Sequence, residues 1–163
     1  MNVEDKISEA YEKSLRWLTI RNAGIIAIPK QIENLDKLER LQLDDNPIES
    51  FDIDFSNLKN LEYLDLYNCN IKTLPPGLAN LPKLKSLNLG SNLIQNCKLE
   101  NLPKSLKEIN LQKNNLKKIP DDLLTHLNIN EIGVSDNQIE TIENLLNCSK
   151  QIFILNVNNN RIV

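Results

Sequence analysis

The chain has 163 residues with a formal net charge of -3; 40% are hydrophobic and 25% charged. The mean hydropathy is -0.36, and no stretch approaches the roughly 20 consecutive apolar residues that a membrane-spanning helix needs. An isoelectric point near 5.3 also argues against the basic composition typical of nucleic-acid-binding domains. These values favour a single soluble domain that does not enter the membrane.

The segment 1–17 predicts a helix. Apolar or small side chains recur there at helical spacing, at Val3, Ile7, Ala10, Tyr11 and Ser14. Asn2 is placed to cap the first turn, and Glu4 and Asp5 favour the positive end of a helix dipole. We therefore predict an N-terminal capping helix in residues 1–17. It covers one end of residues 18–163, which belong to the same domain.

One eight-residue motif then occurs seven times. The copies read LTIRNAGI, LQLDDNPI, LDLYNCNI, LNLGSNLI, INLQKNNL, IGVSDNQI and LNVNNNRI, beginning at Leu18, Leu41, Leu64, Leu87, Ile109, Ile132 and Leu155. They are 22 or 23 residues apart. In the pattern LxLxxNxI, the two apolar residues two positions apart face the same side of an extended strand. The repetition predicts seven stacked units, each with one strand.

The sixth motif position is expected to turn the chain and to form a ladder of hydrogen bonds. The ladder residues are Asn46, Cys69, Asn92, Asn114, Asn137 and Asn160, with Ala23 in the first copy. An amide side chain both donates and accepts, so it satisfies backbone groups of its own turn and of the neighbouring one. Cys69 and Ala23 are the two residues that replace asparagine at this position.

These motifs resemble those of the leucine-rich repeat family over residues 18–163. The resemblance implies an α/β fold, a right-handed, horseshoe-shaped solenoid with a parallel β-sheet on its concave face. Apolar residues at every third position after each motif, such as Ile32, Leu35 and Leu38, predict short helical or 3₁₀ returns on the convex face. The one shortened copy carries LPKSL at residues 102–106, which resembles the bacterial subclass of the family.

The three cysteines, Cys69, Cys97 and Cys148, lie in separate repeats, and their odd number and wide spacing argue against a disulfide framework. The N-terminal residues MNVEDKISEA are polar and acidic, unlike a secretion signal. We therefore expect a cytoplasmic protein if this N-terminus is native. Removal of a secretion signal stays open as an alternative.

Catalytic chemistry is not expected. The single histidine, His126, lies in a return segment, away from the strand residues Ser135 and Asp136. The chain has no metal-ligand spacing of the CxxC or HExxH type, and its four glycines are isolated rather than gathered in a phosphate loop. The prediction is a non-catalytic protein with no catalytic residue, no metal and no cofactor.

The resemblance implies a protein-interaction scaffold, and the outward strand residues of the concave face are the candidate contacts. The first three repeats mix aromatic and charged side chains there, as interface hot spots do. The predicted partner-binding residues are Trp17, Arg21, Arg40, Asp44, Asp45, Tyr63, Asp65 and Tyr67. Their acidic members predict a protein or peptide partner with a basic segment.

Two other functions are considered. The chain ends at Ile162-Val163 directly after the seventh motif, so one alternative is a structural scaffold that self-assembles, or forms a homodimer, through its C-terminal edge. The other is nucleic-acid binding through a basic cluster of Lys104, Lys107, Lys113, Lys117 and Lys118. The acidic isoelectric point and the few aromatic residues disfavour nucleic acid.

Overall fold

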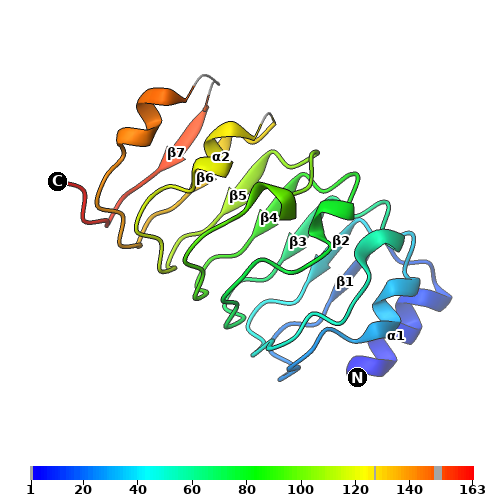
Figure 1. Cartoon of the computed structure of the whole chain (residues 1–163). Helices are drawn as coiled ribbons and strands as arrows, with labels where there is room; N and C mark the ends of the chain where they lie inside the picture. Colours follow the sequence, from blue (N-terminus) through cyan, green and yellow to red (C-terminus); the bar gives the residue numbers. More distant parts are fainter. Residues whose placement is uncertain (1, 127, 149–151) are drawn as a thin grey trace.

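A computed structural model describes residues 2–126, 128–148 and 152–163. Seven short strands form one parallel sheet in sequence order (Figure 1). They are β1 (Trp17–Thr19), β2 (Arg40–Gln42), β3 (Tyr63–Asp65), β4 (Ser86–Asn88), β5 (Glu108–Asn110), β6 (Glu131–Gly133) and β7 (Ile154–Asn156). Leu18 pairs with Leu41 and Leu41 with Leu64, so equivalent motif positions lie side by side. The predicted solenoid with a parallel sheet is confirmed.

Helical elements precede the sheet and return the chain between its strands (Figure 1). They are α1 (Val3–Glu12), η1 (Lys30–Asn34), η2 (Phe55–Asn57), η3 (Leu78–Asn80), η4 (Leu99–Asn101), α2 (Asp121–Thr125) and η5 (Glu143–Asn147). Apart from α1, each has only three to five residues, and most are 3₁₀ helices. This length suits a return that must close within one repeat of 22 or 23 residues.

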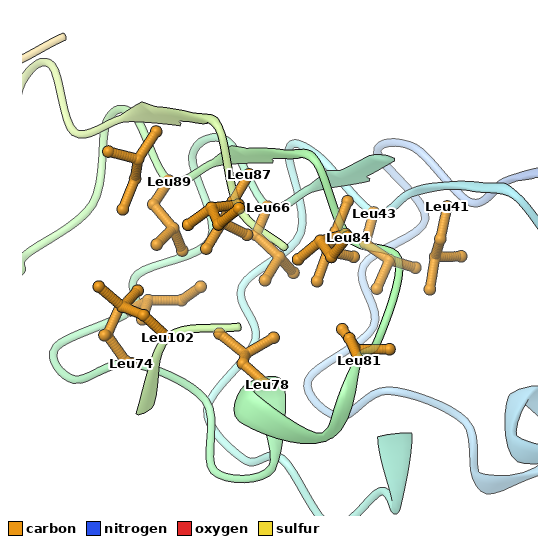
Figure 2. Packing of buried hydrophobic residues seen from close by; sticks show 14 of the residues in the cluster. Leu41, Leu43, Leu66, Leu74, Leu78, Leu81, Leu84, Leu87, Leu89 and Leu102 are labelled. Atoms are coloured by element: carbon orange, nitrogen blue, oxygen red, sulfur yellow. The ribbon is translucent and has the colours of Figure 1, made fainter. Parts of the chain in front are cut away.

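The core lies between the strands and the returns. Leu41, Leu43 and Leu66 from the strand side face Leu78 and Leu81 from the return side (Figure 2), and all five are buried. Because the two apolar motif residues lie two apart on a strand, both point into this layer while their neighbours point away from it. Stacking successive repeats makes the layer continuous along the solenoid.

The backbone turn after each strand is made by the fifth motif residue, not by the sixth as predicted. All seven fifth residues have a positive φ, between 47° and 59°: Asn22, Asp45, Asn68, Ser91, Lys113, Asp136 and Asn159. Five of them are Asn or Asp, the residues other than glycine that tolerate this left-handed conformation best. The turn there allows the sixth side chain to point inward.

The sixth side chains bond to the preceding repeat. Asn92 is typical: its Oδ1 accepts from the backbone N–H groups of Cys69 (3.0 Å) and Ile71 (2.9 Å). Its Nδ2 donates to the carbonyl oxygens of Leu66 (2.8 Å), Leu89 (3.0 Å) and Gly90 (3.0 Å). One amide thus satisfies five backbone groups that water does not reach.

Cys69 makes a different rung. Its thiol lies 3.3 Å from the carbonyl oxygen of Leu43, which it can satisfy as a donor, but it has no amide oxygen to accept from the repeat before it. The N–H of Ile48, which would use that oxygen, bonds instead to the carbonyl of Asn46 at 2.8 Å. Burial raises the pKa of the Cys69 thiol to about 11, so the residue acts as a small, unreactive donor.

Helix α1 covers the first repeat through its buried residues Ile7 and Ala10. Its first turn carries reciprocal caps, because Asn2 Oδ1 accepts from the N–H of Asp5 (2.8 Å) and Asp5 Oδ2 accepts from the N–H of Asn2 (3.1 Å). The helix ends at Glu12 and is therefore shorter than the predicted capping segment 1–17.

The chain leaves the helix at Ser14, whose φ is +50°. The N–H of Leu15 bonds to the carbonyl of Ala10 at 2.9 Å, the six-to-one bond of a Schellman ending. This turn redirects the backbone within a few residues, so that Trp17 is already the first residue of β1.

The seventh repeat is less covered than the others. Leu155 and Val157 of its motif are only partly buried, whereas their equivalents Leu41 and Leu43 are fully buried. Self-assembly through this edge stays a prediction. None of the helices in the three described ranges is long and apolar enough to cross a membrane.

Candidate functional site

Side chains of the sheet that point away from the core form three rows across the strands. The first row is Trp17, Arg40, Tyr63, Ser86, Glu108, Glu131 and Ile154. The second row is Thr19, Gln42, Asp65, Asn88, Asn110, Gly133 and Asn156. The third row, two residues further along each repeat, is Arg21, Asp44, Tyr67, Gly90, Gln112, Ser135 and Asn158. The predicted contact residues gather in the first three repeats, on β1 to β3 and in the residues that directly follow these strands.

Arg40 lies between two aromatic rings of the first row. Its Cζ is 4.4 Å from the centroid of the Tyr63 ring and 6.0 Å from that of Trp17. The Trp17 indole, 60% exposed, donates from Nε1 to Gln42 Oε1 at 3.1 Å. Exposed cation–π contacts of this kind contribute about 0.5–1 kcal/mol each. The result is a row in which flat and cationic groups contact one another.

Tyr63 is also held by the second row. Its hydroxyl donates to Asp65 Oδ2 at 2.9 Å, and the backbone N–H of Tyr67 donates to Asp65 Oδ1 at 3.0 Å. Burial, together with the bond to Asp65, raises the pKa of Tyr63 to about 12. Both carboxylate oxygens of Asp65 therefore accept hydrogen bonds from groups of the same chain.

Arg21 spans two acidic residues of the second repeat. Its Nε lies 2.7 Å from Asp44 Oδ2 and its terminal nitrogen 3.1 Å from Asp45 Oδ2. Asn68 donates to the second oxygen of Asp45 at 3.0 Å, and the bonds from Asn68 and Arg21 lower the pKa of Asp45. Burial, and then the charge of Asp65, raises the pKa of Asp44, whose Oδ1 is buried and has no hydrogen-bond partner among the described residues.

Asp44 and Asp65 lie on the outward side of their strands, as predicted, but they are only 6% and 8% exposed. The carboxylates of Asp44, Asp45 and Asp65 lie in two neighbouring repeats. They would repel one another unless cations or hydrogen-bond donors lay over them. Arg21 and the Tyr63 hydroxyl supply these groups and cover the acids. Asp44 and Asp65 thus orient the side chains around them, while Trp17, Arg21 and Arg40 are exposed and Tyr63 and Tyr67 half-buried.

Gly90 determines how Tyr67 lies. A Cβ added at Gly90 would stand 3.0 Å from Tyr67 Cδ2 and 3.1 Å from Gln112 Cγ, closer than side chains normally approach. The tyrosine ring thus lies across the glycine on the neighbouring strand. The sequence interpretation set Gly90 aside as an isolated glycine, although its third-row position one repeat after Tyr67 was a usable signal.

Glu108 and Glu131 were not among the predicted contact residues. They pair in register on β5 and β6, and no ion pair joins either one within the described part of the chain. They border a hollow of about 310 Å³ on the sheet, between Tyr63 on one side and Ile154 on the other. Two acids at the same position of consecutive repeats were the signal that was missed.

Three lysines of the predicted basic cluster, Lys104, Lys113 and Lys118, lie in different parts of the repeats. Lys104 borders a hollow of about 1320 Å³ on the return side, between η3 and α2, where one repeat is a residue short. Lys113 lies in the turn after β5, and Lys118 pairs with Asp121 at the start of α2. His126, in the same return-side hollow, is buried with Nε2 3.0 Å from the carbonyl oxygen of Pro103.

The raised pKa of Asp44 predicts a pH dependence. A carboxyl whose folded pKa lies above its usual 3.8 binds protons more tightly in the folded state, so ionising it destabilises the fold. This penalty is absent below the unfolded pKa and grows as the pH rises through the folded one. We expect the free energy of unfolding of wild type, relative to Asp44→Asn, to be highest near the usual carboxyl pKa of 3.8 and lower at neutral pH. Urea denaturation of both proteins across this range measures it; a constant difference contradicts the assignment.

The comparisons with known proteins agree with this architecture. The family described as leucine rich repeat matches residues 13–71, 36–94 and 105–127. The chain therefore belongs to the leucine-rich repeat family. Proteins of this family generally mediate protein–protein interaction and are typically non-catalytic. The search of curated proteins found no match.

Several solved structures resemble the chain. Internalin C2 of Listeria monocytogenes is 26% identical with a TM-score of 0.74, covering 97% of this chain and 74% of its own. A leucine-rich repeat protein of Leptospira interrogans is 26% identical with a TM-score of 0.69, covering 93% and 45%. A plant ice-binding protein is 26% identical with a TM-score of 0.66, covering 90% and 49%. The chain thus spans less than half the length of the last two.

Proposed function

We propose that the concave face binds a protein or peptide segment and that the first three strands supply the main contacts. The observation that supports this most strongly is the arrangement of Trp17, Arg40 and Tyr63. Binding an ordered side chain costs less conformational entropy than binding a mobile one, so a surface already held by cation–π contacts and hydrogen bonds is prepared for a partner. Tryptophan, tyrosine and arginine are also the residues enriched in hot spots.

The eight proposed site residues have different roles in this proposal. Trp17, Arg21, Arg40 and Tyr67 make direct contact, with Asp45 and Tyr63 beside them. Asp44 and Asp65 are positioning residues, because their oxygens serve Arg21, Tyr63 and the backbone. The proposed role is non-catalytic and needs no cofactor.

A basic segment remains the preferred partner because the concave face and its rim are acidic. Their acidic side chains are Asp44, Asp45, Asp65, Glu108, Glu131 and Asp136, and their basic ones are Arg21, Arg40 and Lys113. The toll-like receptor 13 structure, 25% identical with a TM-score of 0.61, is a complex with single-stranded RNA, and it covers 73% of this chain and 18% of its own. For the present chain, the acidic face and the dispersed lysines favour a protein over nucleic acid. If the N-terminus is native, we propose that this interaction takes place in the cytoplasm, and the buried thiols of Cys69 and Cys97 support this.

The proposal is tested with peptides selected from a random displayed library for binding to the whole chain. We expect Trp17→Ala/Tyr67→Ala to weaken the selected peptides by about tenfold or more, since two hot-spot aromatics are removed. Fluorescence anisotropy with synthetic copies of the peptides measures the affinity.

The matched control is Tyr11→Ala, which removes an exposed aromatic of α1 away from the sheet. Its affinity for the peptides should equal that of wild type. Peptides that bind the double variant normally, or that lose affinity only with Tyr11→Ala, would show that the binding surface lies elsewhere.

A further inference from the structure

The first row of the concave sheet changes its chemistry at Ser86. On β1 to β3 the row carries Trp17, Arg40 and Tyr63, and on β5 and β6 it carries Glu108 and Glu131. Ser86 on β4 lies between the two groups, and its small side chain lines the hollow of about 310 Å³, which extends from Tyr63 over β4, β5 and β6 to Ile154. The part of this hollow above Ser86 is the gap in the row. It lies between Tyr63 on one side and Glu108 on the other.

The two glutamates lack a countercharge. Neighbouring strands lie about 4.8 Å apart, and like charges directly opposite one another destabilise a sheet. Lys85, the residue before β4, forms an ion pair with Glu62 at 2.8 Å. No cation of the described residues lies within ion-pair distance of Glu108 or Glu131. A cation from outside would relieve their repulsion.

Tyr63 shows how this row accommodates a cation. The Arg40 guanidinium carbon lies 4.4 Å from the centroid of the Tyr63 ring, on the β2 side. Tyr63 also borders the hollow over β4. Arg40 and Ser86 pair with Tyr63 from the two neighbouring strands, so each lies one strand spacing from it. A second guanidinium above Ser86 would therefore be about as far from Tyr63 as Arg40 is.

We infer that the gap above Ser86 receives an arginine side chain of the protein partner, stacked on Tyr63 and paired with Glu108 and Glu131. Arginine fits better than lysine, because a planar guanidinium can stack on a ring and bond to carboxylates at the same time. This inference rests on the proposed function and names the partner group that one part of the concave face recognises.

The test is an NMR titration of the ¹⁵N-labelled chain with the peptide acetyl-Gly-Ser-Arg-Ser-Gly-amide. We expect saturable shifts of the backbone amides of Ser86, Asn88 and Gly133, which border the gap. The same peptide with citrulline in place of arginine keeps the shape but loses the charge. It should bind more weakly by about tenfold, and added salt should weaken the arginine peptide.

Two variants locate the site. Glu108→Gln/Glu131→Gln should weaken the arginine peptide by about tenfold, whereas Glu49→Gln/Glu140→Gln removes the same charge from exposed positions off the concave face and should leave it unchanged. Ser86→Arg fills the gap from within, so it should abolish peptide binding and raise the midpoint of thermal unfolding.

Equal affinity of the arginine and citrulline peptides, or full affinity in Glu108→Gln/Glu131→Gln, would overturn the inference. Normal peptide binding by Ser86→Arg would do the same. If these results occur while displayed peptides still depend on Trp17 and Tyr67, only the arginine site fails. Loss of that dependence overturns the proposed function itself.

Discussion

Replacing Asn92 with alanine should lower the free energy of unfolding by roughly 3–5 kcal/mol, because two buried donors and three buried acceptors lose their partner at once. Asn92 is only 4% exposed, so water cannot replace the amide without opening the turn. The donors lose most, since the N–H groups of Cys69 and Ile71 share Oδ1 as acceptor. Urea denaturation followed by circular dichroism measures the change.

The control for Asn92 is Asn158→Ala. Asn158 is an exposed asparagine in the third row of the concave face, and its substitution should change stability by no more than about 0.5 kcal/mol. Equal losses in the two variants would mean that the ladder amide contributes no more than a surface side chain. That result would contradict the role assigned to the sixth motif position.

Phe55→Ala should also destabilise the chain, by roughly 3–5 kcal/mol. Phe55 is the first residue of η2 and is fully buried, with its ring beneath Gly77. Truncation removes most of a large apolar side chain from a packed layer, and the flanking returns can collapse only partly into the space. The measurement is the shift of the denaturation midpoint at an unchanged slope.

Phe153→Ala provides a matched comparison, since it removes the same ring from a site that is 63% exposed. We expect a change within about 0.5 kcal/mol. If Phe153→Ala lowers the free energy of unfolding as much as Phe55→Ala does, burial of the Phe55 ring on the return side does not explain its effect.

The repeat explains why so much of the fold could be predicted. Leu41 and Leu43 lie two residues apart, and this spacing recurs in seven copies, so strand, inward face and stacking follow from local geometry. Asn2 could be named as the helix cap for the same reason, because its partner Asp5 is three residues away. The end of the helix at Glu12 was missed because the Schellman turn at Ser14 has no glycine to signal it.

The site was harder to predict. The position of Trp17, Arg40 and Tyr63 on one face followed from the motif, but the stacking of these side chains depends on rotamers across strands 23 residues apart. The burial of Asp44 and Asp65 could not be predicted, because strand alternation says only which face a residue is on. Alternation does not say whether a neighbour such as Arg21 lies over it.

The amino-acid order by itself determined the number of repeats, the strand in each repeat and the inward leucines. Each of these depends on contacts whose spacing is repeated along the chain. Tertiary structure alone decided which concave charges are used internally and which stay available. Arg21 covers Asp44 and Tyr63 bonds to Asp65, whereas Glu108 and Glu131 have no such partner. The physical reason is that charge pairing between coils depends on the particular side chains that stacking brings side by side, and these differ from copy to copy.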